Sequence, residues 1–200
     1  MKKYRFFSVL VIAVLLVFYN GCSPFHTDGN GRVVSREVSV NEFTGVILDG
    51  AGNVNIHYSE ICRVIVITDS NIQDIIVIKL NDDFVHIDEK SCGGINPTKL
   101  SIDVYLPELS YVNLKGAGNI KIADGKAHDI KLVLSGYGNI DARNFEADNV
   151  EVVLSGVGDI KAWATMSLTG KLSGVGNIIY KGNPPVNSIS KTGVGDIKKY

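Results

Sequence analysis

The sequence predicts an all-β protein, much of it built as a parallel β-helix-like solenoid, and two observations carry this prediction. First, the phrase Gly-x-Gly-(Asn/Asp)-(Ile/Val) recurs at residues 50–54, 116–120, 136–140, 156–160, 174–178 and 193–197. From Gly116 onward its leading glycines are 20, 20, 18 and 19 residues apart, a period typical of stacked coils. Second, short Val-, Ile- and Thr-rich runs alternate with turn-forming Gly, Asn, Asp and Ser, which is typical of strands.

The N-terminus is typical of an exported lipoprotein. A basic segment (1–5) precedes an apolar run (6–18) that is shorter than the roughly 20 residues of a membrane-spanning helix. Gly21-Cys22 then resembles a bacterial lipobox, although Tyr19 replaces the usual Leu. We therefore expect a lipoprotein-type signal peptide (1–21) and acylation of Cys22, since more than one acyl chain gives a stable anchor. The alternative is an ordinary signal peptide followed by an incidental cysteine.

The remaining chain is expected to form one domain on a short tether. Residues 22–35 are polar and are predicted to be the tether, and residues 36–200 are long enough for a single core. The net charge of −1 gives no reason to expect a nucleic-acid partner. We expect the protein to contact the membrane through its lipid anchor and to have an envelope protein or a glycan as its partner. Ser23 favours the outer membrane, with the side of display left open.

The N-terminal half of the domain is predicted to contain antiparallel hairpins. Strand-like runs occupy 36–40, 45–49, 55–58, 63–68, 75–80, 84–88 and 100–106. Asn81-Asp82-Asp83 is a tight-turn signal between two of them, and 69–78 has room for one helical turn. Cys62 and Cys92 are a candidate disulfide in an oxidising compartment, the alternative being two separate buried thiols.

From Pro107 onward the chain divides into five coils. Their predicted bounds are 107–125, 126–145, 146–164, 165–183 and 184–200. Aliphatic residues recur two and four positions before each glycine pair and four positions after its first glycine, with mostly polar residues between them. This period-2 alternation turns an aliphatic face inward, so coils stacked about 4.8 Å apart would build columns of Leu and Ile.

Each Gly-x-Gly phrase is interpreted as a corner of the coil. Glycine adopts positive φ without strain, and Asn or Asp tolerates neighbouring turn conformations. Stacked corners would place the following side chains in one hydrogen-bonded ladder: Asn53, Asn119, Asn139, Asp159, Asn177 and Asp196. A column of Ser135, Ser155, Ser173 and Thr192 should run beside it.

The residues between the paired glycines vary, and their direction decides their role. They are Ala51, Ala117, Tyr137, Val157, Val175 and Val194. Pointing outward, Tyr137, Val157 and Val175, with Trp163 nearby in sequence, would form an apolar stripe for a partner or a sugar. Pointing inward or half-buried, they would fill the corner of the core, which is the interpretation that we favour.

The last coil departs from the pattern. Lys191 and Lys199 replace inward aliphatic residues, and Pro184-Pro185 opens the coil. Charges and prolines keep other chains from pairing with an open strand edge. We therefore interpret these lysines as a cap, with a basic binding patch as the alternative.

Together these features resemble the head GIN domain family of auto-transporter adhesin-like proteins. The resemblance covers residues 36–200 and rests on Gly50–Val54, the hydrophobic hairpins, the lead-in Val104–Leu109 and the serial Gly-x-Gly phrases. It implies a right-handed parallel β-helix-like fold in envelope lipoproteins of Gram-negative bacteria. It implies no reaction, because members of the family lack an established one.

No residue pattern in the sequence favours catalysis or a cofactor. The Gly-x-Gly phrases lack the third glycine and helix of a dinucleotide site and the nine-residue period of calcium-binding repeats. The histidines lack metal-ligand spacing, and Asp141 is expected between Lys121 and Lys161, which would keep it ionised. We predict no catalytic residue, no metal and no cofactor. The expected function is a non-catalytic adhesin-like or scaffold module of the cell envelope; the alternative is a carbohydrate-active β-helix enzyme.

Overall fold

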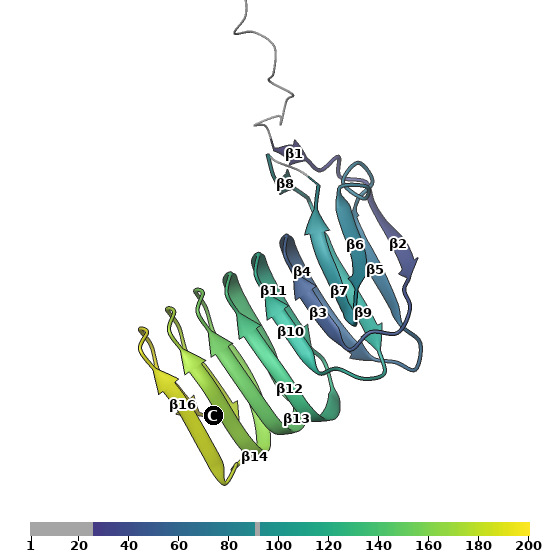
Figure 1. Ribbon diagram of the computed structural model, residues 1–200. Coiled ribbons are helices and arrows are strands. Elements are labelled where there is room, and N and C mark those ends of the chain that lie inside the picture. Colours follow the sequence, from purple (N-terminus) through teal and green to yellow (C-terminus); the bar gives the residue numbers. More distant parts are fainter. Residues whose placement is uncertain (1–25, 91–92) are drawn as a thin grey trace, which may run out of the picture.

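The computed structural model describes residues 26–90 and 93–200, and these residues fold into a long stack of strands (Figure 1). Every regular element in these ranges is a β-strand, so the predicted all-β class is confirmed. Among the described residues there is no helix long and apolar enough to cross a membrane. The expected signal peptide (1–21) and Cys22 lie outside the described residues.

One mixed sheet of 15 strands bends into two faces. The first face runs, in spatial order, through β7 (Phe84–Glu89), β3 (Gly45–Leu48), β10 (Tyr111–Leu114), β12 (Gly125–Leu134), the end of β13 (Tyr137–Leu154), the end of β14 (Ile160–Leu172) and β16 (Val186–Lys191). The second runs through β9 (Leu100–Leu106), β4 (Ala51–Tyr58), β11 (Ala117–Ile122), the starts of β13 and β14, β15 (Ile178–Lys181) and β17 (Ile197–Lys199).

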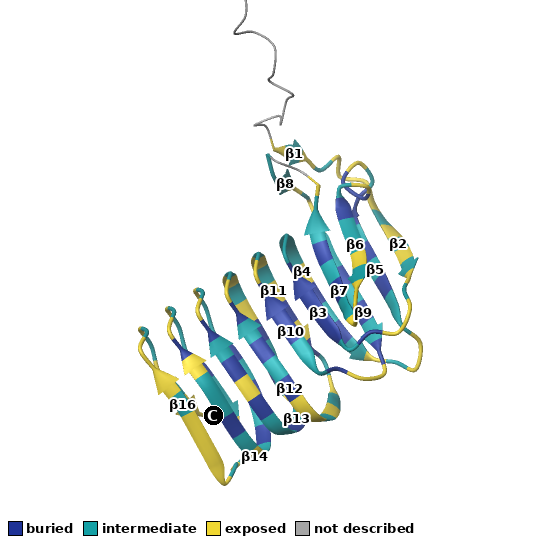
Figure 2. Cartoon of the chain, viewed as in Figure 1, coloured by how far each residue is buried: buried dark blue, intermediate teal, exposed yellow. Residues whose placement is uncertain are grey.

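Parallel pairing from β10 onward joins residues one sequence period apart. Leu114 pairs with Leu134, and Leu134 with Leu154, on the first face. Ile120 and Ile140 pair in the same way on the second face. These side chains are buried, and buried positions alternate with half-buried or exposed ones along most of these strands (Figure 2). The aliphatic columns expected from the period-2 pattern therefore form the core.

The N-terminal end of the stack is antiparallel, so the sheet is mixed. β2 (Val33–Ser39) and β5 (Arg63–Asp69) extend the second face beyond β9, and β6 (Ile76–Asn81) extends the first face beyond β7. The turn between β6 and β7 consists of Asp82 and Asp83, with Asp82 at φ 51°, which confirms the expected hairpin.

The order of coils in space differs from their order in sequence. The coil made by β7 and β9 comes after β3 and β4 in the chain but lies outside them in the stack. In addition, β1 (Thr27–Asp28) pairs with β8 (Ile95–Asn96), a strand in the loop between β7 and β9. Part of the segment expected to be a tether (22–35) therefore pairs with the domain.

The two ends of the stack are closed to different extents. At the N-terminal end, a turn over 70–75 buries Ile72 completely, and the Arg36 guanidinium donates to the backbone carbonyls of Gln73 and Ile76. At the C-terminal end, β16 is largely exposed (Figure 2), and so is β17. Lys191 and Lys199 are both at the surface.

Candidate functional site

The residues between the paired glycines form a continuous outer edge of the stack, here called the corner ridge. Its members are Ala51, Ala117, Tyr137, Val157, Val175 and Val194. Neighbouring members pair through parallel backbone bridges. Tyr137 is 68% exposed, Val157 44%, Val175 50% and Val194 69%. The interpretation that these residues fill the core is wrong, because their side chains point outward.

Backbone contact between coils explains why the positions on either side of these residues are glycine. A Cβ on Gly156 would lie 2.0 Å from the carbonyl oxygen of Gly136, and one on Gly158 would lie 1.6 Å from that of Gly138. Gly158 also has a φ of +137°, which L-residues rarely adopt. A side chain at either position would therefore collide with the backbone of the preceding coil, so each of these ridge residues is flanked by glycines.

A ladder of side-chain amides and carboxylates borders the ridge on one side. Asn139 Nδ2 donates to Asn119 Oδ1 at 2.9 Å, and Asn119 Nδ2 donates to Asn53 Oδ1 at 3.0 Å. Further along, the Asp159 backbone N–H donates to Asn139 Oδ1 at 3.0 Å, and Asn177 donates to Asp159 Oδ1 through its backbone and its side chain. The Asp196 N–H completes the series by donating to Asn177 Oδ1 at 3.0 Å. The structure thus joins all six residues of the expected ladder.

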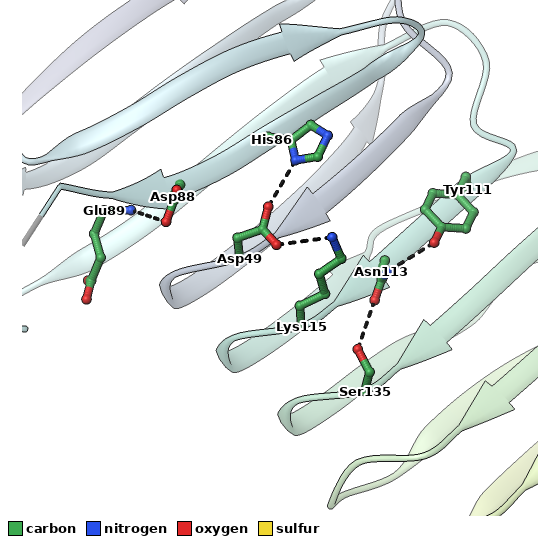
Figure 3. Close-up of polar contacts among 8 residues, drawn as sticks. All are labelled: Asp49, His86, Asp88, Glu89, Tyr111, Asn113, Lys115 and Ser135. Atoms are coloured by element: carbon green, nitrogen blue, oxygen red, sulfur yellow. Dashed lines mark hydrogen bonds and ion pairs between the residues drawn. The ribbon is translucent and has the colours of Figure 1, made fainter. Parts of the chain in front are cut away.

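A second polar column borders the ridge on its other side. Near the N-terminal end of the ridge, Asp49 Oδ2 lies 2.9 Å from His86 Nδ1, and Asp49 Oδ1 lies 3.3 Å from Lys115 Nζ (Figure 3). Ser135 then donates to Asn113 Oδ1 at 3.5 Å. Ser155, Ser173 and Thr192 follow as exposed residues. The ridge is therefore an apolar line between two hydrogen-bonding borders.

A cavity opens at the N-terminal end of the ridge. Its volume is about 560 Å³, and its lining comes from the first corner and from the loop that leads into β9. The lining residues are Ala51, Gly52, Asn53, Ile95, Pro97, Thr98, Lys99, Leu100 and Ser101. Lys99 is the charged residue among them.

Trp163 does not lie on the ridge. It pairs in register with Lys181 on the second face, and Lys181 Nζ lies 3.5 Å from the centre of its ring. This is a cation–π contact between neighbouring coils. The structure therefore separates Trp163 from Tyr137, Val157 and Val175, with which it was grouped as a candidate binding stripe.

The carboxylate of Asp141 on the second face is held ionised. Asp141 lies in register between Lys121 and Lys161, as expected, but its direct partner is Arg143, whose Nε and Nη2 donate at 2.9 and 2.8 Å. These hydrogen bonds lower the pKa of Asp141 below the ordinary value of 3.8, with Lys161 as a weaker cause. An acid of this kind cannot supply the proton that glycoside hydrolysis needs.

Glu89 is a perturbed acid that the sequence did not indicate. Burial, and secondly the charge of Asp88, raise the pKa of Glu89, and its Oε2 has no hydrogen-bond partner among the described residues. Asp88 Oδ1 instead accepts the Glu89 backbone N–H at 2.7 Å (Figure 3). Only the placement of β7 beside β3 brings Glu89 close to the corner at Gly50, which no local pattern predicts.

The side chains that could coordinate a metal ion are spread over the structure rather than grouped. Within residues 26–90 and 93–200, no three His, Cys, Asp or Glu side chains gather where they could hold a metal ion. Cys62 is half-buried, and its expected disulfide partner Cys92 lies outside the described residues. The Cys62–Cys92 disulfide therefore stays a prediction.

Comparison with known proteins indicates a family. The family model described as "Putative auto-transporter adhesin, head GIN domain" matches residues 42–124 and 112–184. A structure called a "putative adhesin" from Bacteroides fragilis NCTC 9343 is 24% identical with a TM-score of 0.59, over 86% of this chain and 99% of that one. A "putative lipid binding protein" from Parabacteroides distasonis ATCC 8503 is 20% identical with a TM-score of 0.51, over 88% and 99%. At these identities the two structures show likeness of fold alone. No curated protein matches the chain.

Proposed function

Because the chain belongs to the head GIN domain family, we propose that it is a non-catalytic lipoprotein of the cell envelope that acts as an adhesin-like or scaffold binding module. We also propose that its architecture is a right-handed parallel β-helix-like solenoid closed by antiparallel strands at the N-terminal end. The one-period parallel register from β10 to β17 supports this description.

The observation that carries the binding proposal is the exposed corner ridge. Tyr137, Val157, Val175 and Val194 form an apolar line held in register by backbone bridges. Contiguous apolar surface rimmed by polar groups is typical of interaction sites. Because the backbone already fixes these residues, a partner would bind with little loss of conformational entropy. The ridge is therefore the surface through which we expect the module to act.

Adhesion of protein-coated beads to an array of neutral and acidic glycans and immobilised envelope proteins tests this proposal. We expect a triple variant, Tyr137→Ser with Val157→Ser and Val175→Ser, to lose the adhesion that the unaltered protein shows. Met166→Ser with Val186→Ser, which changes exposed apolar residues away from the ridge, is the matched control and should adhere normally. Equal adhesion by both variants, or no adhesion by the unaltered protein, would contradict the proposal.

The proposed anchor is the acylated Cys22, with the outer membrane as its location. Cys22→Ala should release the protein from the membrane fraction, because the domain then has no acyl chains to bury. Fractionation of cells expressing each form, followed by immunoblotting, measures this release. Cys62→Ala is the control and should stay with membranes. Retention of Cys22→Ala in the membrane fraction would rule out the anchor.

A further inference from the structure

The cavity beside the ridge lies where the hydrogen-bond ladder ends. Asn53, the last ladder residue at this end, lines the cavity together with residues 95 and 97–101, which run from β8 into the start of β9. Leu100, Ile95 and Pro97 give it an apolar wall, whereas Lys99 and Ser101 add polar groups. The cavity thus combines an apolar wall with polar groups in similar proportion, so it can pack against a ligand and also hydrogen-bond to it.

The ladder has a fixed direction, and this direction determines what Asn53 offers to the cavity. A backbone N–H can only donate, so the bond from the Asp159 N–H fixes Asn139 Oδ1 as its acceptor. Asn139 must then turn its amide nitrogen toward Asn119, which in turn donates to Asn53. Consequently Asn53 uses its oxygen within the ladder, and no described residue accepts from its Nδ2.

Two further donors line the same cavity. Ser101 is in register with Asn53 on the neighbouring strand, and its Oγ accepts from Asn55 Nδ2 at 3.3 Å, which leaves its hydroxyl hydrogen available. The Lys99 ammonium forms no ion pair with any described residue. Thr98 differs, because its hydroxyl donates to Asp69 Oδ1 at 2.7 Å. The lining contains no acidic residue to neutralise Lys99.

We propose that this cavity binds the carboxylate of a sugar acid. Lys99 and the Asn53 amide would donate to the carboxylate, the Ser101 hydroxyl would donate to a ring hydroxyl, and the apolar wall would cover a C–H face of the sugar ring. A bare inorganic anion would leave that wall unused. The inference rests on the proposed role as a binding module but not on the ridge, whose exposed members Tyr137, Val157 and Val175 do not line the cavity.

Ligand-observed saturation-transfer NMR on the full-length protein in detergent tests the proposal with D-galacturonate, D-galactose and inorganic phosphate as probes. We expect galacturonate to bind, galactose to bind at least about tenfold more weakly, and Lys99→Gln to weaken galacturonate binding by a similar factor, because each change removes a charge-assisted hydrogen bond. Asn53→Asp should also weaken it, since this change keeps the ladder acceptor but replaces the cavity donor with a charge that repels the carboxylate.

Matched variants separate this site from general effects and from the ridge. Lys171→Gln and Asn187→Asp change exposed residues outside the cavity lining and should bind galacturonate normally. The ridge triple variant should also bind normally, so that failure of the ridge proposal and failure of this one are distinguishable. Binding of phosphate but not galacturonate, equal binding of galactose, or unchanged binding by folded Lys99→Gln and Asn53→Asp would overturn the assignment.

Discussion

The two glycines of each corner are required for different physical reasons. Gly156 has an ordinary φ but no space, because a Cβ would meet the backbone of the preceding coil. Gly158 has neither an ordinary φ nor space. Gly31 is the opposite case, since its φ is +76° but nothing lies within 4 Å of its Cβ position. The chain therefore contains positions at which the two effects can be measured separately.

We predict that Gly→Ala substitutions at these three positions destabilise in a graded order. Gly31→Ala should cost about 1–2 kcal/mol, the strain of a positive φ in an L-residue. Gly156→Ala and Gly158→Ala should each cost more, because coils in direct backbone contact must move apart, with Gly158→Ala the most damaging. Urea denaturation followed by circular dichroism gives the three free energies of unfolding. An effect at Gly158 no larger than at Gly31 would refute the argument from stacking.

The paired Asp141 and Arg143 predict a pH effect with a definite sign. The pKa of Asp141 is lowered, so the ionised carboxylate stabilises the folded state. This stabilisation is fully present at a pH above about 3.8, the ordinary pKa of the group, and is lost as the pH falls through the lowered pKa. Arg143→Gln should raise the Asp141 pKa toward that ordinary value, which carboxyl-carbon NMR titration measures. Lys161→Gln is the control and should raise it less. An equal rise in both variants would show that Arg143 is not the main cause.

At the level of elements, the ladder stiffens the corners by joining coils through side chains as well as backbone. Asn139 takes part in two ladder bonds, one as donor and one as acceptor. Such bonds between partly hydrated groups each contribute about 0.5–1.5 kcal/mol. The ladder therefore adds to the stability of the stack without providing its main driving force, which is the burial of the Leu and Ile columns.

Asn139→Ala should accordingly lower the free energy of unfolding by about 1–2 kcal/mol, since it removes both bonds while leaving the aliphatic core intact. Differential scanning calorimetry of this variant beside Asn187→Ala measures the difference. Asn187 is an exposed residue of β16 outside the ladder, so its substitution should have little effect. If Asn139→Ala lowered the free energy of unfolding no more than Asn187→Ala, the ladder hydrogen bonds would be no stronger than the hydrogen bonds to water that replace them in the unfolded chain.

The sequence allowed the repeated elements to be predicted and failed where the repeat is absent. The columns of Leu and Ile and the asparagine ladder follow from a period that any reader of residues 107–200 can measure. The position of β7 and β9 does not follow from this period, because their coil lacks a Gly-x-Gly corner. That coil also pairs with earlier strands out of sequence order. The cavity lies between these two coils, so Lys99 and Ser101 could not be grouped with Asn53 beforehand. The outward direction of the ridge could not be predicted from side-chain character either, because apolar residues such as Val157 and Val175 occupy exposed positions there.

At the scale of the whole molecule, the stack has one closed end and one open end. β2, β5 and β6 extend past the coils at the N-terminal end, where Ile72 is fully buried. In the last coil, Ile189 and Ile197 are only partly buried, and Lys191 takes the place held by Leu172 in the coil before it. In a stack, each coil is stabilised chiefly by its immediate neighbours. A coil with one neighbour and a poorer core should therefore open independently of the rest.

Native-state hydrogen exchange should show this as a gradient along the stack. Backbone amides of β16 and β17 should exchange at least about tenfold faster than those of β11 and β12, which corresponds to an opening free energy lower by about 1.4 kcal/mol. Lys191→Leu supplies the internal control: it restores the aliphatic column, so it should slow exchange in β16 and leave β11 and β12 unchanged. Uniform protection from β10 to β17, unaffected by Lys191→Leu, would show instead that the whole stack opens as a single cooperative unit, and that the lysines of the last coil neither weaken nor isolate it.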